Sequence, residues 1–158
     1  MTQEDILARL QTVMDPEIPV LSVVRMGIIH EVRVQGDEVE IDMVPTFAGC
    51  PAIAVMRQDI ERVCYEAGAG TVRVNVLYRK SWSTNQITPE GKHTLKTFGI
   101  SPPPEIGPEL TPEDLVQAQC PRCDSYNTRL MNSFGPTACR AIHHCDDCHE
   151  TFEQMKPL

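Results

Sequence analysis

The stretch "EVRVQGDEVEIDMVPTFAGCPAIAVMRQDI", residues 31–60, carries the pattern that decides the fold. Its first half alternates apolar and charged residues on both sides of the dipeptide Gly36-Asp37, which suits a two-residue hairpin loop. Such alternation is typical of antiparallel strands that bury one face and expose the other. The apolar positions of the two predicted strands are Val32, Val34, Val39, Ile41 and Met43.

A helix is predicted to follow the hairpin, from Pro51 to about Ala67. Its apolar residues recur at helical spacing and share one face: Ile53, Met56, Ile60, Val63, Cys64 and Ala67. Residues 71–79 alternate again and predict a third strand, while residues 3–14 and 89–98 predict two further helices. The order is α-β-β-α-β-α, which indicates a small α+β sandwich domain over residues 1–100.

The remainder of the chain is expected to form a linker and a small module. Residues 101–117 are rich in proline and predict a stiff linker. Residues 118–158 are too few to hold an apolar core unaided, so we expect a covalent or metal crosslink in this module.

The charge balance excludes some classes of protein. The chain of 158 residues has 14 Lys and Arg against 22 Asp and Glu, a net charge of −8. After residue 100 only 4 basic residues face 9 acidic ones, which argues against nucleic-acid binding. No apolar run approaches the roughly 20 residues of a membrane span, and no signal-peptide pattern opens the chain. We expect a cytoplasmic protein with no membrane partner.

Two Cys-x-x-Cys pairs, Cys120/Cys123 and Cys145/Cys148, predict a metal site in the second module. The 21 residues between the pairs suit a hairpin that brings four thiolates to one ion. Four cysteines close the coordination sphere, which favours structural zinc, with iron as the other candidate. Asp124 and His149 replace the usual glycine after each pair, where the chain needs a positive φ, and both types tolerate that conformation.

Three residues between the pairs keep alternatives open. Cys139 is either a substitute metal ligand or a free thiol. His143 and His144 either alternate across a strand, with one side chain inward and one solvated, or contribute to metal or proton chemistry. A packing role is the commoner one for such histidines.

Cys50 is the candidate functional thiol of the first domain. With Pro51 at the first helical position, Cys50 is expected to be the helix N-cap, where free N–H groups and the helix dipole favour the thiolate. The Thr46 hydroxyl is expected nearby. The alternative is a small residue packed at a tight turn. Cys64 lies on the apolar helix face and is expected in the core. A thiol enzyme needs a base, and His30 and His93 follow no catalytic motif.

Several motifs resemble a known family. "DPEIPV" (15–20) and "PTFAGCP" (45–51) resemble the α+β domain of iron–sulfur cluster assembly and carrier factors. "SWST" (81–84), "FGISPPP" (98–104), "CPRC" and "SFGPTACRA" (133–141) extend the resemblance to the PaaD subunits of phenylacetyl-CoA epoxidase (ring-1,2-oxygenase) systems. The resemblance implies an accessory subunit that helps assemble an iron or iron–sulfur centre through Cys50 and Thr46, and that has no turnover alone.

The same resemblance implies oxygenase and iron–sulfur reductase subunits as partners in phenylacetate catabolism; a homo-oligomer stays open. The chain lacks the Glu-x-x-His pair of di-iron bundles and a glycine-rich nucleotide loop, so it matches neither of those enzymes itself. The cofactors expected are structural zinc and a transient iron or iron–sulfur cluster at Cys50. The alternative function is a structural oxygenase subunit in which Cys50 is merely packed.

Overall fold

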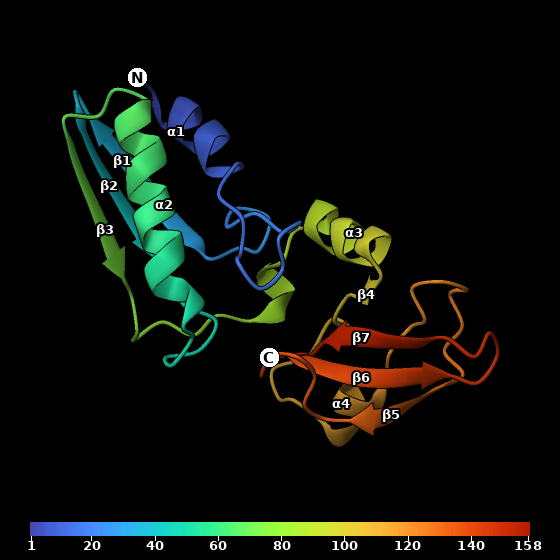
Figure 1. The fold of residues 1–158 in the computed structure, drawn as a ribbon. Coiled ribbons are helices and arrows are strands. Elements are labelled where there is room, and N and C mark those ends of the chain that lie inside the picture. Colours follow the sequence, from blue (N-terminus) through green and yellow to red (C-terminus); the bar gives the residue numbers. More distant parts are fainter. The chain divides into compact units, whose positions relative to one another are not determined.

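The computed structural model describes all residues, 1–158, and divides them into two compact units, Met1–Trp82 and Ser83–Leu158. Figure 1 traces the elements of each unit in chain order. The longest helix has 15 residues, and no helix combines the length and the apolar character that a bilayer crossing requires.

The first unit contains two helices and a three-stranded sheet. They are α1 (Gln3–Leu10), β1 (Ile29–Gln35), β2 (Glu38–Met43), α2 (Ala52–Glu66) and β3 (Thr71–Val76), and the strand order is β1-β2-β3. The predicted hairpin is confirmed, because β1 and β2 pair antiparallel around a turn in which Gly36 has a φ of 64°. β2 and β3 pair parallel because α2 carries the chain back across the sheet.

The core of the first unit lies between the helices and one face of the sheet. The predicted apolar face of α2 is buried through Ile53, Met56, Ile60, Val63 and Cys64. It meets Val32, Val39, Ile41 and Val74 from the strands, all of them buried. The charged residues that alternate with them face the other way, so the sheet has one buried and one polar face, as the sequence pattern predicted.

α1 is shorter than predicted. It ends at Leu10 rather than near residue 14, because the Val13 N–H turns back to the Leu10 carbonyl at 3.1 Å. Met14 then forms an isolated antiparallel bridge with Ser22. Val13 still reaches the core, so the apolar spacing of this segment arises from a helix followed by a turn.

The second unit is built around a four-stranded sheet in the order β4-β7-β6-β5. Its elements are the 3₁₀ turn η1 (Thr84–Gln86), α3 (Pro89–Phe98), β4 (Ile100–Ser101), α4 (Pro112–Val116), β5 (Thr128–Asn132), β6 (Arg140–Cys145) and β7 (Thr151–Met155). β5, β6 and β7 pair antiparallel as a meander, and β4 joins the edge of β7 in parallel.

The division between the units differs from the expected domain limits. The helix at residues 89–98 forms as predicted, but it belongs to the second unit instead of closing a first domain of residues 1–100. The reason is β4, whose Ile100 and Ser101 lie opposite Glu153 and Gln154 of β7. The expected linker of residues 101–117 therefore begins inside a strand, and it also contains the capped helix α4.

Candidate functional site

The two Cys-x-x-Cys pairs adopt the same tight turn. The Asp124 N–H donates to the Cys120 carbonyl at 3.0 Å, and the His149 N–H donates to the Cys145 carbonyl at 2.9 Å. Asp124 and His149 each have a φ of 63°, as predicted for the position after the second cysteine. Each turn directs its two thiols to the same side, which is the local requirement for binding one ion with two pairs.

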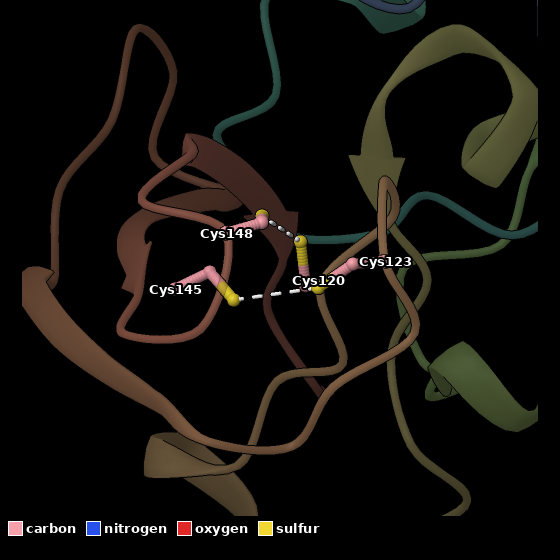
Figure 2. A group of neighbouring side chains, drawn as sticks. All are labelled: Cys120, Cys123, Cys145 and Cys148. Atoms are coloured by element: carbon pink, nitrogen blue, oxygen red, sulfur yellow. Dashed lines mark hydrogen bonds between the residues drawn. The ribbon is translucent and has the colours of Figure 1, made fainter.

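The four cysteine sulfurs gather at one point (Figure 2). All lie within 4.8 Å of one another; the Cys120 and Cys148 sulfurs are 3.6 Å apart, and so are those of Cys123 and Cys145. Zn–S bonds of about 2.3 Å in a tetrahedron place neighbouring sulfurs about 3.8 Å apart. The residues present therefore fit a tetrahedral tetrathiolate metal site, and the pairs meet as the spacing predicted.

The thiols of this cluster have pKa values shifted in opposite directions. The Ser125 N–H lowers the pKa of Cys123, but desolvation and the neighbouring sulfurs raise it more strongly, to about 12. In contrast, N–H groups of Cys148 and Asp147 lower the pKa of Cys145 to about 7. Four thiolates at this separation repel one another, so a cation is needed to hold all four deprotonated.

Cys139 is not part of the cluster. It lies just before β6, whereas Cys145 ends that strand, and the rise of about 3.3 Å per residue separates them by about 20 Å. Its Sγ contacts the Thr137 hydroxyl at 3.1 Å instead. Of the two alternatives, Cys139 is therefore the free thiol and not a substitute ligand.

The two histidines of β6 alternate as the packing interpretation predicted. His143 is fully buried and stacks on Phe152, with ring centroids 5.8 Å apart. Burial lowers the pKa of His143 and keeps its ring neutral. His144 is half-buried, and its Nδ1 lies 3.1 Å from the Thr151 hydroxyl. Neither belongs to the group of metal-ligating side chains.

Cys50 lies in the loop between β2 and α2, beside the helix start. The helix begins at Ala52 with Pro51 as N-cap, so Cys50 is one residue farther out than predicted. Its side chain is half-buried, and the Ala52 N–H and the Thr46 hydroxyl form hydrogen bonds with it. The thiol lines an open groove of about 460 Å³ between α2 and β3.

The expectation that the helix end lowers the pKa of Cys50 and favours its thiolate is wrong in direction. Burial raises the pKa of Cys50 above its ordinary value, and the hydrogen bonds from Ala52 and Thr46 offset this only in part. The carboxylates of Glu17 and Asp15 raise it further. The helix end favours a negative charge on the sulfur, but the tertiary neighbours disfavour it more strongly.

The other candidate residues of the first unit have structural surroundings. Cys64 is fully buried, and burial raises its pKa to about 11, so the predicted core position is confirmed. His30 is exposed and contacts Lys80. Sequence reasoning missed Tyr78, which lines the Cys50 groove although it is 62% exposed. The sequence pattern placed Tyr78 inside the predicted strand of residues 71–79, whereas β3 ends at Val76, so no local signal set this tyrosine apart.

Each of the two units contains a segment that matches a known protein family. The family model described as an iron–sulfur cluster assembly protein matches residues 3–77, and the PaaD zinc beta ribbon domain matches residues 107–156. An Escherichia coli (strain K12) protein, provisionally named as one of the subunits of 1,2-phenylacetyl-CoA epoxidase, is 36% identical over 154 residues. That match covers 96% of this chain and 91% of the E. coli protein.

Further similarities concern the first unit. A Porphyromonas gingivalis Fe-S protein maturation auxiliary factor is 34% identical over 91 residues, which are 56% of this chain and 86% of that protein. The crystal structure of a domain of unknown function, DUF59, from Bacillus anthracis is 25% identical, with a TM-score of 0.55, over 59% of this chain and 90% of that one. The structure of a conserved hypothetical protein, TM0487, from Thermotoga maritima is 26% identical, with a TM-score of 0.53. That match covers 63% of this chain and 96% of the T. maritima chain.

The fold and the four-cysteine site define a protein in which an iron–sulfur-assembly domain precedes a metal-binding β-ribbon. The nearly full-length relative makes the assignment more specific, and the chain belongs to the PaaD family. The resemblance seen in the sequence motifs is thereby confirmed.

Proposed function

We propose that this protein is an accessory subunit of a phenylacetyl-CoA ring-epoxidising oxygenase system that assists assembly of an iron or iron–sulfur centre. It has no turnover of its own. Its partners are the oxygenase and iron–sulfur reductase subunits of that system. The proposal is supported by the E. coli relative named as an epoxidase subunit and by the P. gingivalis relative named as a maturation factor.

The observation that carries the proposal is the placement of Cys50. Within the domain that matches iron–sulfur assembly proteins, it is the half-exposed thiol that lines a groove, while Cys64 is sealed in the core. Iron and its clusters are held in proteins by thiolates. Because burial and carboxylates keep Cys50 protonated, iron binding there is coupled to loss of the thiol proton. Thr46 orients the sulfur through its hydroxyl.

The ribbon has a separate and structural role in this proposal. Cys120, Cys123, Cys145 and Cys148 hold one zinc ion, whose closed four-sulfur coordination leaves no position for a substrate. Zinc stabilises the ribbon as a folded surface, while the cargo chemistry resides at Cys50.

The test compares Cys50→Ser with Cys64→Ser as the matched cysteine control. Each variant replaces the native chain in cells that produce the oxygenase and reductase, and the iron content and activity of the purified oxygenase are measured. We expect Cys50→Ser alone to lower both, with folding and zinc content unchanged. Equal maturation with Cys50→Ser and wild type would contradict the role of Cys50.

A structural subunit is the second candidate, and the raised pKa of Cys50 favours it, because a buried neutral thiol also suits packing. The two functions differ in a purified system. Matured oxygenase and reductase should form product without this protein if it assists assembly. Dependence of that mixture on the protein would support the structural subunit instead.

A further inference from the structure

The outer edge of β3 has free hydrogen-bonding groups. β3 is the last strand of its sheet and pairs with β2 alone (Figure 1). The Thr71 N–H donates to Asp37 at 3.3 Å and the Leu77 N–H to Met43 at 2.8 Å, so the odd-numbered residues face β2. By the alternation of parallel pairing, the N–H and C=O groups of the even-numbered residues, Val72, Val74 and Val76, point to the open edge.

The groove that contains Cys50 runs beside this edge. α2 forms one wall through Ile53, Ala54 and Arg57. The last residue of β3, Val76, and Tyr78 just beyond the strand form the other wall. A strand edge next to a helix is the arrangement in which recognition domains bind extended peptides by adding a strand to the sheet.

A second hollow of about 240 Å³ continues the surface past Tyr78. Tyr78 lines both hollows, and the second one also includes Thr46, Phe47 and Lys80. Phe47 is 37% exposed and Tyr78 is 62% exposed, so two aromatic side chains are presented on the surface around the Cys50 loop. Exposed aromatic residues at a concave site are typical of protein interfaces.

The charge of this strand and its flanks is opposite to that of the chain. The protein has a net charge of −8, yet residues 67–89 contain three basic residues and no acidic one. Arg79 and Lys80 are exposed where the strand leaves the sheet, and the Lys80 ammonium contacts His30, which is itself a basic side chain. Arg57 in the groove is paired with Glu61 at 3.1 Å, so the unbalanced positive charge lies at the Tyr78 end.

We infer that this surface binds an extended, acidic segment of a partner protein, which adds a strand to the β3 edge. The backbone of the segment pairs with Val72, Val74 and Val76, its acidic side chains meet Arg79 and Lys80, and the groove holds it beside Cys50. The inference rests on the proposed function in one respect: the segment belongs to the client whose metal centre Cys50 helps assemble.

The other edge of the sheet is less suited to this role. β1 has an irregular register between Ile29 and Glu31, and such bulges hinder the addition of a strand. β3 pairs without interruption from Thr71 to Val76 and therefore presents a regular edge.

The test titrates the isotope-labelled full chain, loaded with its metal, with an eight-residue peptide that alternates glutamate and valine. The same peptide with lysine in place of glutamate is the control ligand. Amide shifts and hydrogen exchange locate binding. The variants are Val76→Pro, which removes an edge N–H that the sheet does not use, and Lys80→Glu, with Lys92→Glu of the second unit as the matched control.

The acidic peptide should shift and protect the amides of Val72, Val74 and Val76. Lys80→Glu should weaken its binding about tenfold at low salt, while Lys92→Glu leaves it unchanged. Equal binding of both peptides, or shifts confined to β1, would overturn the inference. So would concentration-dependent dimerisation that Val76→Pro abolishes, because the occupant would then be a second copy.

The docking inference and the proposed function can fail separately. The peptide should bind Cys50→Ser as it binds the wild type, because backbone pairing does not need the thiol. If Cys50→Ser loses maturation but still binds the peptide, the result supports the role of Cys50 and leaves the docking inference standing. Loss of peptide binding in Lys80→Glu with intact maturation would refute the assignment of this edge to the client.

Discussion

Removal of the ribbon's metal should unfold β5, β6 and β7 while the first unit stays folded. The reason lies in the core of the ribbon, which consists of Ala118, Cys120, Cys145 and Phe152, with Cys148 packed against it. Three of these five residues belong to the four-cysteine cluster that fits a metal ion. The core of the ribbon and the proposed metal site therefore share most of their side chains.

The magnitudes favour unfolding without the metal. Full burial of the Phe152 side chain contributes about 1.5–3 kcal/mol, and the Ala118 methyl adds about 0.8 kcal/mol. Structural zinc in small cysteine sites contributes about 10–16 kcal/mol near neutral pH. Ordering each residue costs more than about 1 kcal/mol, so the apolar contacts cannot replace the metal.

Hydrogen exchange of the full chain, with and without a strong chelator, measures the extent of unfolding. Amides of Ile142 in β6 and Phe152 in β7 should lose protection. Ile100 in β4 should lose protection as well, because its strand pairs with β7 alone. Amides of Ile41 in β2 should exchange as slowly as before, since that strand belongs to the first unit.

Two cysteine variants provide the matched comparison. Cys145→Ser removes a ligand and should abolish tight binding of the metal, whereas Cys139→Ser should keep one metal ion per chain. If the chelated protein keeps β6 and β7 protected, or if Cys139→Ser loses the metal as readily as Cys145→Ser, the assignment of the four ligands is wrong.

Three further predictions concern single positions. Burial raises the pKa of Cys64 to about 11, above about 8.5 for an exposed thiol, so the folded state disfavours the Cys64 thiolate. Wild-type stability should fall by about 2–3 kcal/mol between pH 8.5 and 11. Denaturant unfolding should show no such fall for Cys64→Ala. Trp82→Phe removes a hydrogen bond from Nε1 to the Met26 carbonyl at 3.0 Å and should cost about 1–3 kcal/mol in the same assay. His149 has a φ of 63°, so His149→Val should lower the melting temperature of the metal-loaded ribbon while His149→Gly should not; equal melting of the two variants would contradict backbone strain there.

Local patterns explain why much of the fold could be predicted. Alternating residues on both sides of Gly36 are sufficient to specify a hairpin, and the apolar face of α2 follows from helical spacing. The positive φ of Asp124 and His149 was also predictable, because each follows a Cys-x-x-Cys turn whose geometry is set within a few residues. In each case the deciding interactions are close together along the chain.

The boundary between the two units could not be predicted from local sequence patterns. β4 has only two residues, and its partners in β7 lie about fifty positions later in the chain. Nothing in the local sequence distinguishes Ile100 and Ser101 from the end of a helix followed by a linker. Their pairing transfers α3 to the second unit, an outcome that depends on a contact formed only after β7 is in place.

The cysteines show the difference between what the sequence by itself determined and what only the tertiary structure decided. The sequence determined that a cysteine lies beside the start of a helix and that four other cysteines form a metal site, because both follow from short-range spacing. The tertiary structure decided that Cys50 stays protonated, because burial and the carboxylates of Asp15 and Glu17, more than thirty residues away in the chain, outweigh the Ala52 N–H. Electrostatic energy depends on distance in space and on exposure to water, and neither quantity is defined until the chain has folded.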